Sequence, residues 1–280
     1  AGVRFWASAF PGGMAAPEAR NRFTGTHRNE KSIAMSAEQS LREGRLTDAL
    51  AELQAQVRKE PANPKHRIFL FQLLAALGQW ERALNQLNVV GEMDALALPM
   101  VQTYREALRC ELFRAEVFAG RRSPLVFGDP APWVALLLEA LRLTAAGQYV
   151  QARMVREQAF ETAPATAGAI DEQPFDWIAD ADPRLGPVLE AIVNGRYYWI
   201  PFQRIQTIAL EQPADLRDYV WMPAQLTWAN GGETVGLIPA RYPGSPASTD
   251  PLVQLGRKTE WQECDAETWL GLGQRMLATD

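Results

Sequence analysis

A recurring pair of small residues constrains the fold of this chain more than any other sequence feature. Gly44 and Ala49 frame the pattern G-x-(large apolar)-x-x-A, and Gly78 and Ala83 repeat it 34 residues later. A third copy begins at Gly147, 69 residues after the second and thus about two further periods on. Self-similarity at such a period predicts that one supersecondary unit is repeated and stacked.

The spacing is that of a tetratricopeptide repeat, a helical hairpin of 34 residues. Pro61 and Pro164 each follow the alanine of a copy by 12 residues, where such a unit closes its second helix. The glycine would end the first helix in a left-handed cap, and the alanine would let the second helix approach closely. We therefore expect three to four helical hairpins in a short curved stack over residues 35–165. Pro99 to about Gly120 forms a more degenerate helical stretch, and a plain helical bundle is the alternative.

The chain changes character after residue 165. Residues 196–202 and 221–228 are rich in aromatic and β-branched side chains typical of strands, and Asn230-Gly231 predicts a hairpin into a returning strand at 235–242. Asp182-Pro183 is a good N-cap and N1 pair and predicts a helix that opens there and runs through residues 187–193 to Asn194-Gly195. Residues 210–217 predict a short helix or turn. The fold class is thus α+β: a tetratricopeptide-like helical-repeat domain, then at 166–280 a small mixed, mainly antiparallel β domain with one or two helices.

The first 34 residues differ from both parts. Five basic residues stand among the first 35 against two acidic ones, without helical or strand periodicity. Met35 followed by a serine resembles a natural start. We expect residues 1–34 to be a mostly disordered leader or an over-called start, with a short basic arm that docks onto the protein as the alternative.

Composition excludes several functional classes. The net charge of -5 argues against a protein that neutralises nucleic-acid phosphates. The longest apolar run covers only six residues, 133–138, far short of the ~20 that span a bilayer. Two cysteines, Cys110 and Cys264, and two histidines offer neither a disulfide framework nor a zinc site. We expect a cytoplasmic protein that binds neither nucleic acid nor membrane.

Three aspartates are the best candidates for chemistry. Asp176, Asp180 and Asp182 could hold Mg²⁺, but no phosphate-binding loop accompanies them. The alternative is that Asp182 caps a helix and the other two face water. Gly271 and Gly273 match the first two glycines of the dinucleotide-binding motif G-x-G-x-x-G, but the third glycine is missing. Too few residues follow them to form a βαβ unit. We expect no metal and no cofactor.

Other reactive pairs have structural interpretations. Cys110 and His66 could act as nucleophile and base, but each lies on a predicted amphipathic helix where packing is the expected role. A buried or half-buried ion pair that organises the sheet explains Arg217 with Asp218, and Arg204, better than a catalytic role does. Nothing in the sequence supports an enzyme.

A stack of such hairpins offers a concave groove that can accept a peptide or a helix. Counting back from the repeat glycines places one set of side chains on the groove side of each first helix. These are Glu38, Leu41 and Arg42, then Lys65, Ile68, Gln72 and Ala75, and finally Val134, Leu137 and Leu141. The alternative is that Ile68 and Leu137 are simply core residues.

The second half also carries an ordered series of aromatic motifs. They are Asn194-Gly-Arg-Tyr-Tyr-Trp-Ile-Pro-Phe-Gln-Arg-Ile205, Leu216-Arg-Asp-Tyr-Val-Trp-Met-Pro-Ala224, Ala229-Asn-Gly231, Ile238-Pro-Ala-Arg-Tyr-Pro243, Thr259-Glu-Trp261 and Gly271-Leu-Gly-Gln-Arg275. With the helical half they make residues 36–280 resemble the ImpE/SciE family, also called TagJ-like, of type VI secretion accessory proteins.

The resemblance implies a cytoplasmic, non-enzymatic protein that works with a contractile sheath. Members bind the small sheath subunit through its N-terminal helix and assist sheath turnover by the AAA+ unfoldase, the second partner that the resemblance implies. Our hypothesis is a sheath adaptor whose helical half grips that helix. The alternatives are a small-molecule or nucleotide-processing enzyme that uses the aspartate cluster, and a general peptide-binding scaffold.

Overall fold

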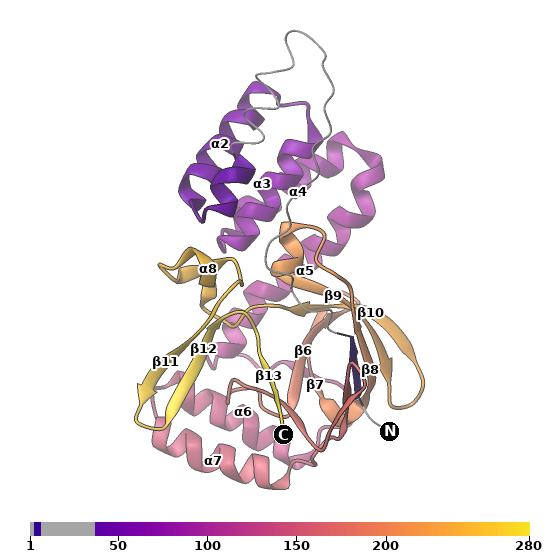
Figure 1. The fold of residues 1–280 in the computed structure, drawn as a ribbon, viewed down its shortest axis with the longest axis vertical. Coiled ribbons are helices and arrows are strands. Elements are labelled where there is room, and N and C mark those ends of the chain that lie inside the picture. Colours follow the sequence, from indigo (N-terminus) through magenta and orange to yellow (C-terminus); the bar gives the residue numbers. More distant parts are fainter. Residues whose placement is uncertain (1–2, 7–36) are drawn as a thin grey trace.

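The computed structural model describes residues 3–6 and 37–280. The helices that precede residue 165 occupy two ends of the molecule, and a large twisted sheet lies between them (Figure 1). Residues 37–42 are helical. The longer helices are α2 (Leu46–Lys59), α3 (Pro64–Ala76), α4 (Trp80–Met93), α5 (Leu98–Phe118), α6 (Pro132–Ala145) and α7 (Tyr149–Thr162), with the 3-10 turn η1 (Ala95–Ala97) before α5.

The repeat glycines act as the motif predicts. Gly44, Gly78 and Gly147 have φ values of +75°, +67° and +73°, which only glycine adopts without strain. After each one, the next backbone N–H bonds back into the helix just ended, as when Gln79 donates to the Leu74 carbonyl at 2.8 Å. The motif alanines are buried. A tetratricopeptide-like helical part is therefore confirmed, with the glycine caps at the predicted positions.

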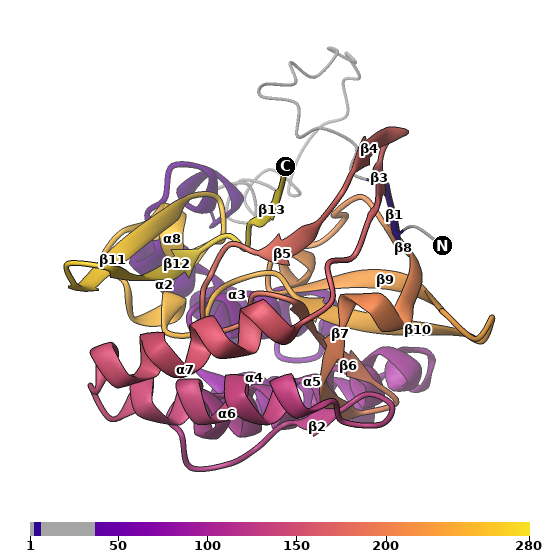
Figure 2. The same cartoon turned by 90° about the horizontal axis from the view of Figure 1, so that it is seen from below.

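The helix pairs do not form one continuous stack, so this part of the prediction is wrong. The first pairs lie at one end and α6 and α7 at the other, with α5 running between them (Figure 1). Helices α6 and α7 lie side by side (Figure 2). The reason is that α5 packs on the sheet as well as on the helices. Its Tyr104 lies 5.6 Å from the Phe71 ring of α3, while Phe113 lies 6.1 Å from Tyr197 of the sheet.

The sheet has nine strands in the order β2-β7-β6-β10-β9-β8-β1-β3-β4. Most neighbours are antiparallel, and the parallel pairs are β1 with β3, β1 with β8 and β2 with β7. The strands are β1 (Val3–Trp6), β2 (Leu125–Val126), β3 (Gly168–Ile170), β4 (Gln173–Phe175), β6 (Val188–Val193), β7 (Arg196–Pro201), β8 (Ile205–Leu210), β9 (Trp221–Trp228) and β10 (Glu233–Pro239).

Two smaller sheets and several turns complete the chain. One sheet pairs β11 (Thr259–Asp265) with β12 (Thr268–Gly273), and the other pairs β5 (Ile178–Asp180) with β13 (Leu277–Thr279). The short helical elements are η2 (Phe202–Arg204), η3 (Leu216–Tyr219), η4 (Ser245–Ala247) and α8 (Pro251–Gln254). Both views place the β11–β12 hairpin at the periphery of the molecule (Figures 1 and 2).

The expected aromatic strands and the Asn230-Gly231 hairpin are confirmed as β7, β9 and β10. The helix expected from Asp182-Pro183 to Asn194-Gly195 is wrong, because Val188–Val193 is the strand β6, buried along its whole length between β7 and β10. Asp182 does cap a turn, since its carboxylate accepts the Arg184 N–H at 2.9 Å. The chain leaves that turn at Gly186 into a β-branched run that suits the sheet centre.

One apolar core joins the helices to the sheet. Leu70 and Phe71 of α3 and Leu108 of α5 belong to the same buried cluster as Trp199 and Trp221 of the sheet. A second cluster lies among the sheet strands and includes Ile208. The division into 35–165 and 166–280 stays a prediction. In the segment 1–34, residues 3–6 form β1, and the rest of the leader prediction lies outside the described residues.

Candidate partner-binding groove

A groove of about 610 Å³ lies between the first helices and the turn before β9. One wall comes from residues 37–42, α2 and α3, and the other from η3 and the residues just before it. It is lined by Glu38, Leu41, Arg42, Gln56, Lys65, His66, Ile68, Phe69, Gln72, Ala214, Asp215, Leu216, Tyr219 and Arg257. Residues that are far apart in the sequence thus build one concave surface.

Most of the side chains predicted for a groove lie in it together. Glu38, Leu41 and Arg42 come from the first helix, and Lys65, Ile68 and Gln72 from α3. The helical period places these positions on one face of each helix. Ile68 is only partly buried and packs against the core. It therefore both lines the groove and contributes to the core, the two roles that the sequence left open.

The third helix predicted to line the groove does not reach it. Val134, Leu137 and Leu141 are buried in the core on α6. The alternative interpretation of Leu137 as a core residue is therefore the one that the structure shows. Ala75 is also fully buried. The physical reason is the position of α5, which separates α6 from the first helix pairs (Figure 1).

The wall formed by η3 was not predicted from the sequence. Leu216 and Tyr219 face helices that lie about 150 residues earlier in the chain, and only the tertiary fold brings them together. A local signal for the turn does exist, because Asp215 and Asp218 form a capping box. The expected Arg217–Asp218 ion pair is wrong: Arg217 pairs with Asp215 at 2.5 Å, and Asp218 instead accepts backbone N–H groups.

The groove combines an apolar floor with a charged rim. Arg42, Lys65 and Arg257 are exposed at its edge. His66 lies 3.1 Å from the Glu60 carboxylate, and hydrogen bonds from Asn63 and His66 hold the pKa of Glu60 below its ordinary value. An apolar trough with polar edges is the kind of surface on which an amphipathic helix binds.

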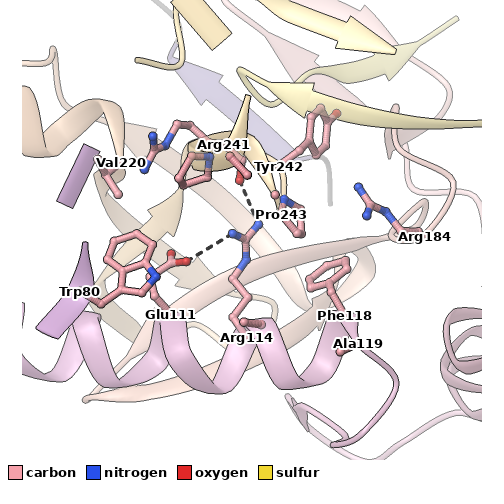
Figure 3. Close-up of a pocket in the computed structure, with 14 residues that line it drawn as sticks. Trp80, Glu111, Arg114, Phe118, Ala119, Arg184, Val220, Arg241, Tyr242 and Pro243 are labelled. Carbon is pink, nitrogen blue, oxygen red and sulfur yellow. Dashed lines mark hydrogen bonds and ion pairs between the residues drawn. The ribbon is translucent and has the colours of Figure 1, made fainter. Parts of the chain in front are cut away.

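A buried network of charges fixes α5 to the sheet, beside a second cavity of about 440 Å³ (Figure 3). Arg114 of α5 donates to the Glu190 carboxylate at 2.6 and 2.9 Å and to the Arg241 carbonyl at 2.9 Å. Burial would raise the pKa of Glu190, but the guanidinium groups of Arg114 and Arg275 lower it to about 2. Glu190 therefore stays ionised at neutral pH.

Arg241 ties the two parts together directly. Its guanidinium donates to the Ala76 carbonyl at 2.6 Å and the Ala75 carbonyl at 3.3 Å, both at the end of α3, and to the Gln254 carbonyl at the end of α8. These carbonyls are unpaired in a bare helix end, and a cation there complements the helix dipole. Burial lowers the pKa of Arg241 to about 10, so it stays charged at neutral pH.

Two of the three candidate metal aspartates belong to this network rather than to a metal site. Asp180 is buried and accepts from the Tyr242 hydroxyl and from Arg275, each at 2.9 Å, which corrects the expectation that it faces water. Asp182 is buried and pairs with Arg184 at 2.6 Å, while Asp176 is exposed. Within residues 37–280, no group of three or more His, Cys, Asp or Glu side chains is placed to hold a metal ion.

The other candidate reactive residues have separate environments. Burial raises the pKa of the Cys110 thiol to about 12, and this thiol donates to the Gly195 carbonyl at 3.5 Å. His66 contacts Glu60 instead. Arg204 donates to the Asp129 carbonyl at 3.3 Å, which is a loop contact and not the expected ion pair.

Comparisons with known proteins agree with this architecture. A model of the ImpE protein family matches residues 172–280, and a tetratricopeptide repeat model matches residues 40–107. The crystal structure of protein VPA1032 from Vibrio parahaemolyticus has a TM-score of 0.79 and 25% identity, covering 86% of this chain and 90% of that one. No helix in the described part of the chain is long and apolar enough to cross a membrane.

A curated relative is similar over nearly the whole length. The type VI secretion system accessory component TagJ of Pseudomonas aeruginosa is 58% identical over 253 residues, which are 90% of this chain and 89% of TagJ. The match confirms the resemblance seen in the aromatic motifs. The chain therefore belongs to the ImpE family of type VI secretion accessory proteins, together with TagJ.

Proposed function

We propose that this protein is an accessory protein of a type VI secretion system that binds the N-terminal helix of the small contractile-sheath subunit in the groove between α3 and η3. It acts in the cytoplasm and without catalysis, and it assists sheath turnover by presenting the subunit to the AAA+ unfoldase. The observation that carries the proposal is the convergence of six predicted side chains, Glu38, Leu41, Arg42, Lys65, Ile68 and Gln72, on one groove.

The chemistry of the groove supports a helical partner. Leu41, Ile68 and Leu216 supply an apolar floor along which one face of an amphipathic helix can lie. The rim charges can pair with the polar flanks of that helix and fix its register. The accessory role itself follows the name of the relative TagJ.

The fixed geometry of the walls supports the binding of a partner. Arg241 holds the end of α3, and the Asp215–Asp218 capping box holds η3, so both walls are in place before a partner arrives. A preformed groove loses less conformational entropy on binding than a flexible one.

The test is a binding assay with the small sheath subunit, with and without its first helix. We expect the intact subunit to bind and the truncated subunit to lose binding. Unchanged binding after the helix is removed would contradict the proposal. Equal binding of unrelated extended peptides would assign the protein to general peptide-binding scaffolds instead.

A further inference from the structure

Two tryptophans of the β11–β12 hairpin stay half exposed on one face. The exposed fractions of Trp261 and Trp269 are 38% and 44%, whereas Trp199 and Trp221 are fully buried. The register pairs Trp261 with Gly271 and Glu263 with Trp269. Directly opposed residues of an antiparallel pair share a face, as do residues two apart on one strand. Trp261, Glu263 and Trp269 therefore lie on the same face, with position 263 directly opposite one tryptophan and two residues from the other.

The hairpin that carries this face is held firmly to the body. The Gly271 N–H donates to the Asp182 carboxylate at 2.8 Å, and the ring of Tyr242 fills the space that a side chain at position 271 would need. Beyond the bend, Glu267 pairs with Arg153 of α7 at 2.5 Å. On the same face, the Trp261 ring packs against the Tyr242 ring with centroids 5.9 Å apart and is still 38% exposed. The two indoles are thus held on a rigid platform, so a ligand would bind them without ordering a loop.

The Glu263 carboxylate has no ion-pair or hydrogen-bond partner within the described residues. Glu263 makes no ion pair or side-chain hydrogen bond with any residue in 37–280, whereas Glu260 pairs with Lys258 and Glu267 with Arg153. An exposed carboxylate flanked by aromatic faces attracts a cation, because the indole quadrupole and the negative charge act in the same direction.

We propose that the face formed by Trp261, Glu263 and Trp269 binds an arginine side chain of a partner protein. The guanidinium stacks on an indole while its N–H groups bond to the Glu263 carboxylate. Arginine fits better than lysine because its planar group can stack and form bidentate hydrogen bonds together. This surface is separate from the groove between α3 and η3, so the inference stands independently of the proposed function.

The test uses protein labelled with 5-fluorotryptophan, whose nine signals are assigned by single Trp→Phe variants. Two probes are titrated: a 12-residue peptide carrying four arginines, and the same peptide with four glutamates in their place. We expect the Trp261 and Trp269 signals to shift together and saturate with the arginine peptide only. Trp177 is 39% exposed but lies outside the hairpin, so its signal should not move.

Two variants separate this face from general attraction to an acidic protein. Glu263→Gln should weaken binding of the arginine peptide about 3- to 5-fold, the size expected for the loss of one exposed ion pair. Glu92→Gln, which changes an exposed carboxylate on α4, should leave binding unchanged.

Three results would overturn the inference. They are equal shifts at Trp177, equal shifts with the glutamate peptide, and full affinity in the Glu263→Gln variant. A fourth is a change of the two signals when Arg20, Arg22 and Arg28 are replaced by glutamine, with no response to added peptide. That result would assign the face to the chain's own basic segment.

Discussion

At the scale of single residues, charged side chains inside the molecule decide how its parts are joined. The Glu190 carboxylate accepts hydrogen bonds from Arg114 and Arg275. The Arg241 guanidinium donates to a backbone carbonyl at the end of α3. None of these partners could be predicted from the sequence, because each pair joins segments tens of residues apart or more and charge alone does not name a partner. The repeat glycines could be predicted, because their role depends on local backbone geometry.

Replacing Glu190 by glutamine tests the network. Breaking a buried ion pair leaves its partners uncompensated, so we expect Glu190→Gln to lower the free energy of unfolding at pH 7 by about 3–5 kcal/mol. The lowered pKa of about 2 means that ionised Glu190 stabilises the fold above its ordinary pKa of 4.5. That contribution is lost as the pH falls from 4.5 towards 2.

Denaturant unfolding at pH 7 and pH 3 measures both effects. The stability difference between wild type and Glu190→Gln should shrink at pH 3. A difference that stays the same at the two pH values would contradict the assignment. Glu139→Gln is the control, because Glu139 pairs with Arg142 on the surface and its loss should leave stability close to that of the wild type.

At the scale of elements, local rules predicted ends of helices and hairpins but not every element between them. The dipeptide Asn230-Gly231 forms the turn of the predicted hairpin between β9 and β10. The motif glycines end their helices in the predicted left-handed conformation. Residues 188–193 became a strand although the capping residues before them favoured a helix. Pairing with β7 and β10 makes this segment a strand. A strand that is buried on both faces shows no alternation of apolar and polar residues, so its sequence cannot be told from a buried helix by periodicity.

Two glycines of the same motif give a matched test of how the helical part meets the rest. Gly78→Ala and Gly147→Ala both force alanine into a left-handed conformation, at about 1–2 kcal/mol each. A Cβ at Gly147 meets nothing within 4 Å, but at Gly78 it lies 2.6 Å from the Pro246 Cβ. We therefore expect Gly78→Ala to be clearly more destabilising in thermal or denaturant unfolding. Equal losses would show that the contact between the α3–α4 turn and η4 contributes nothing.

At the scale of the whole molecule, the groove depends on both halves of the chain. The sequence predicted one wall, on the first helix and α3, because helical periodicity reveals which side chains share a face. It missed Leu216 and Tyr219 on the other wall, since η3 reaches the helices only through the shared core. It also placed Val134, Leu137 and Leu141 in the groove, because a repeat count cannot show that α5 interrupts the stack.

The central claim is that the groove between α3 and η3 binds the first helix of the small sheath subunit. The direct measurement is calorimetric titration of a peptide of that helix into the wild type, Ile68→Glu and Val235→Glu. Val235 is 71% exposed on β10, outside the residues that line the groove, and serves as the control. We expect Ile68→Glu to weaken binding at least tenfold, which corresponds to about 1.4 kcal/mol, and Val235→Glu to bind as the wild type does. Wild-type affinity in Ile68→Glu would contradict the account.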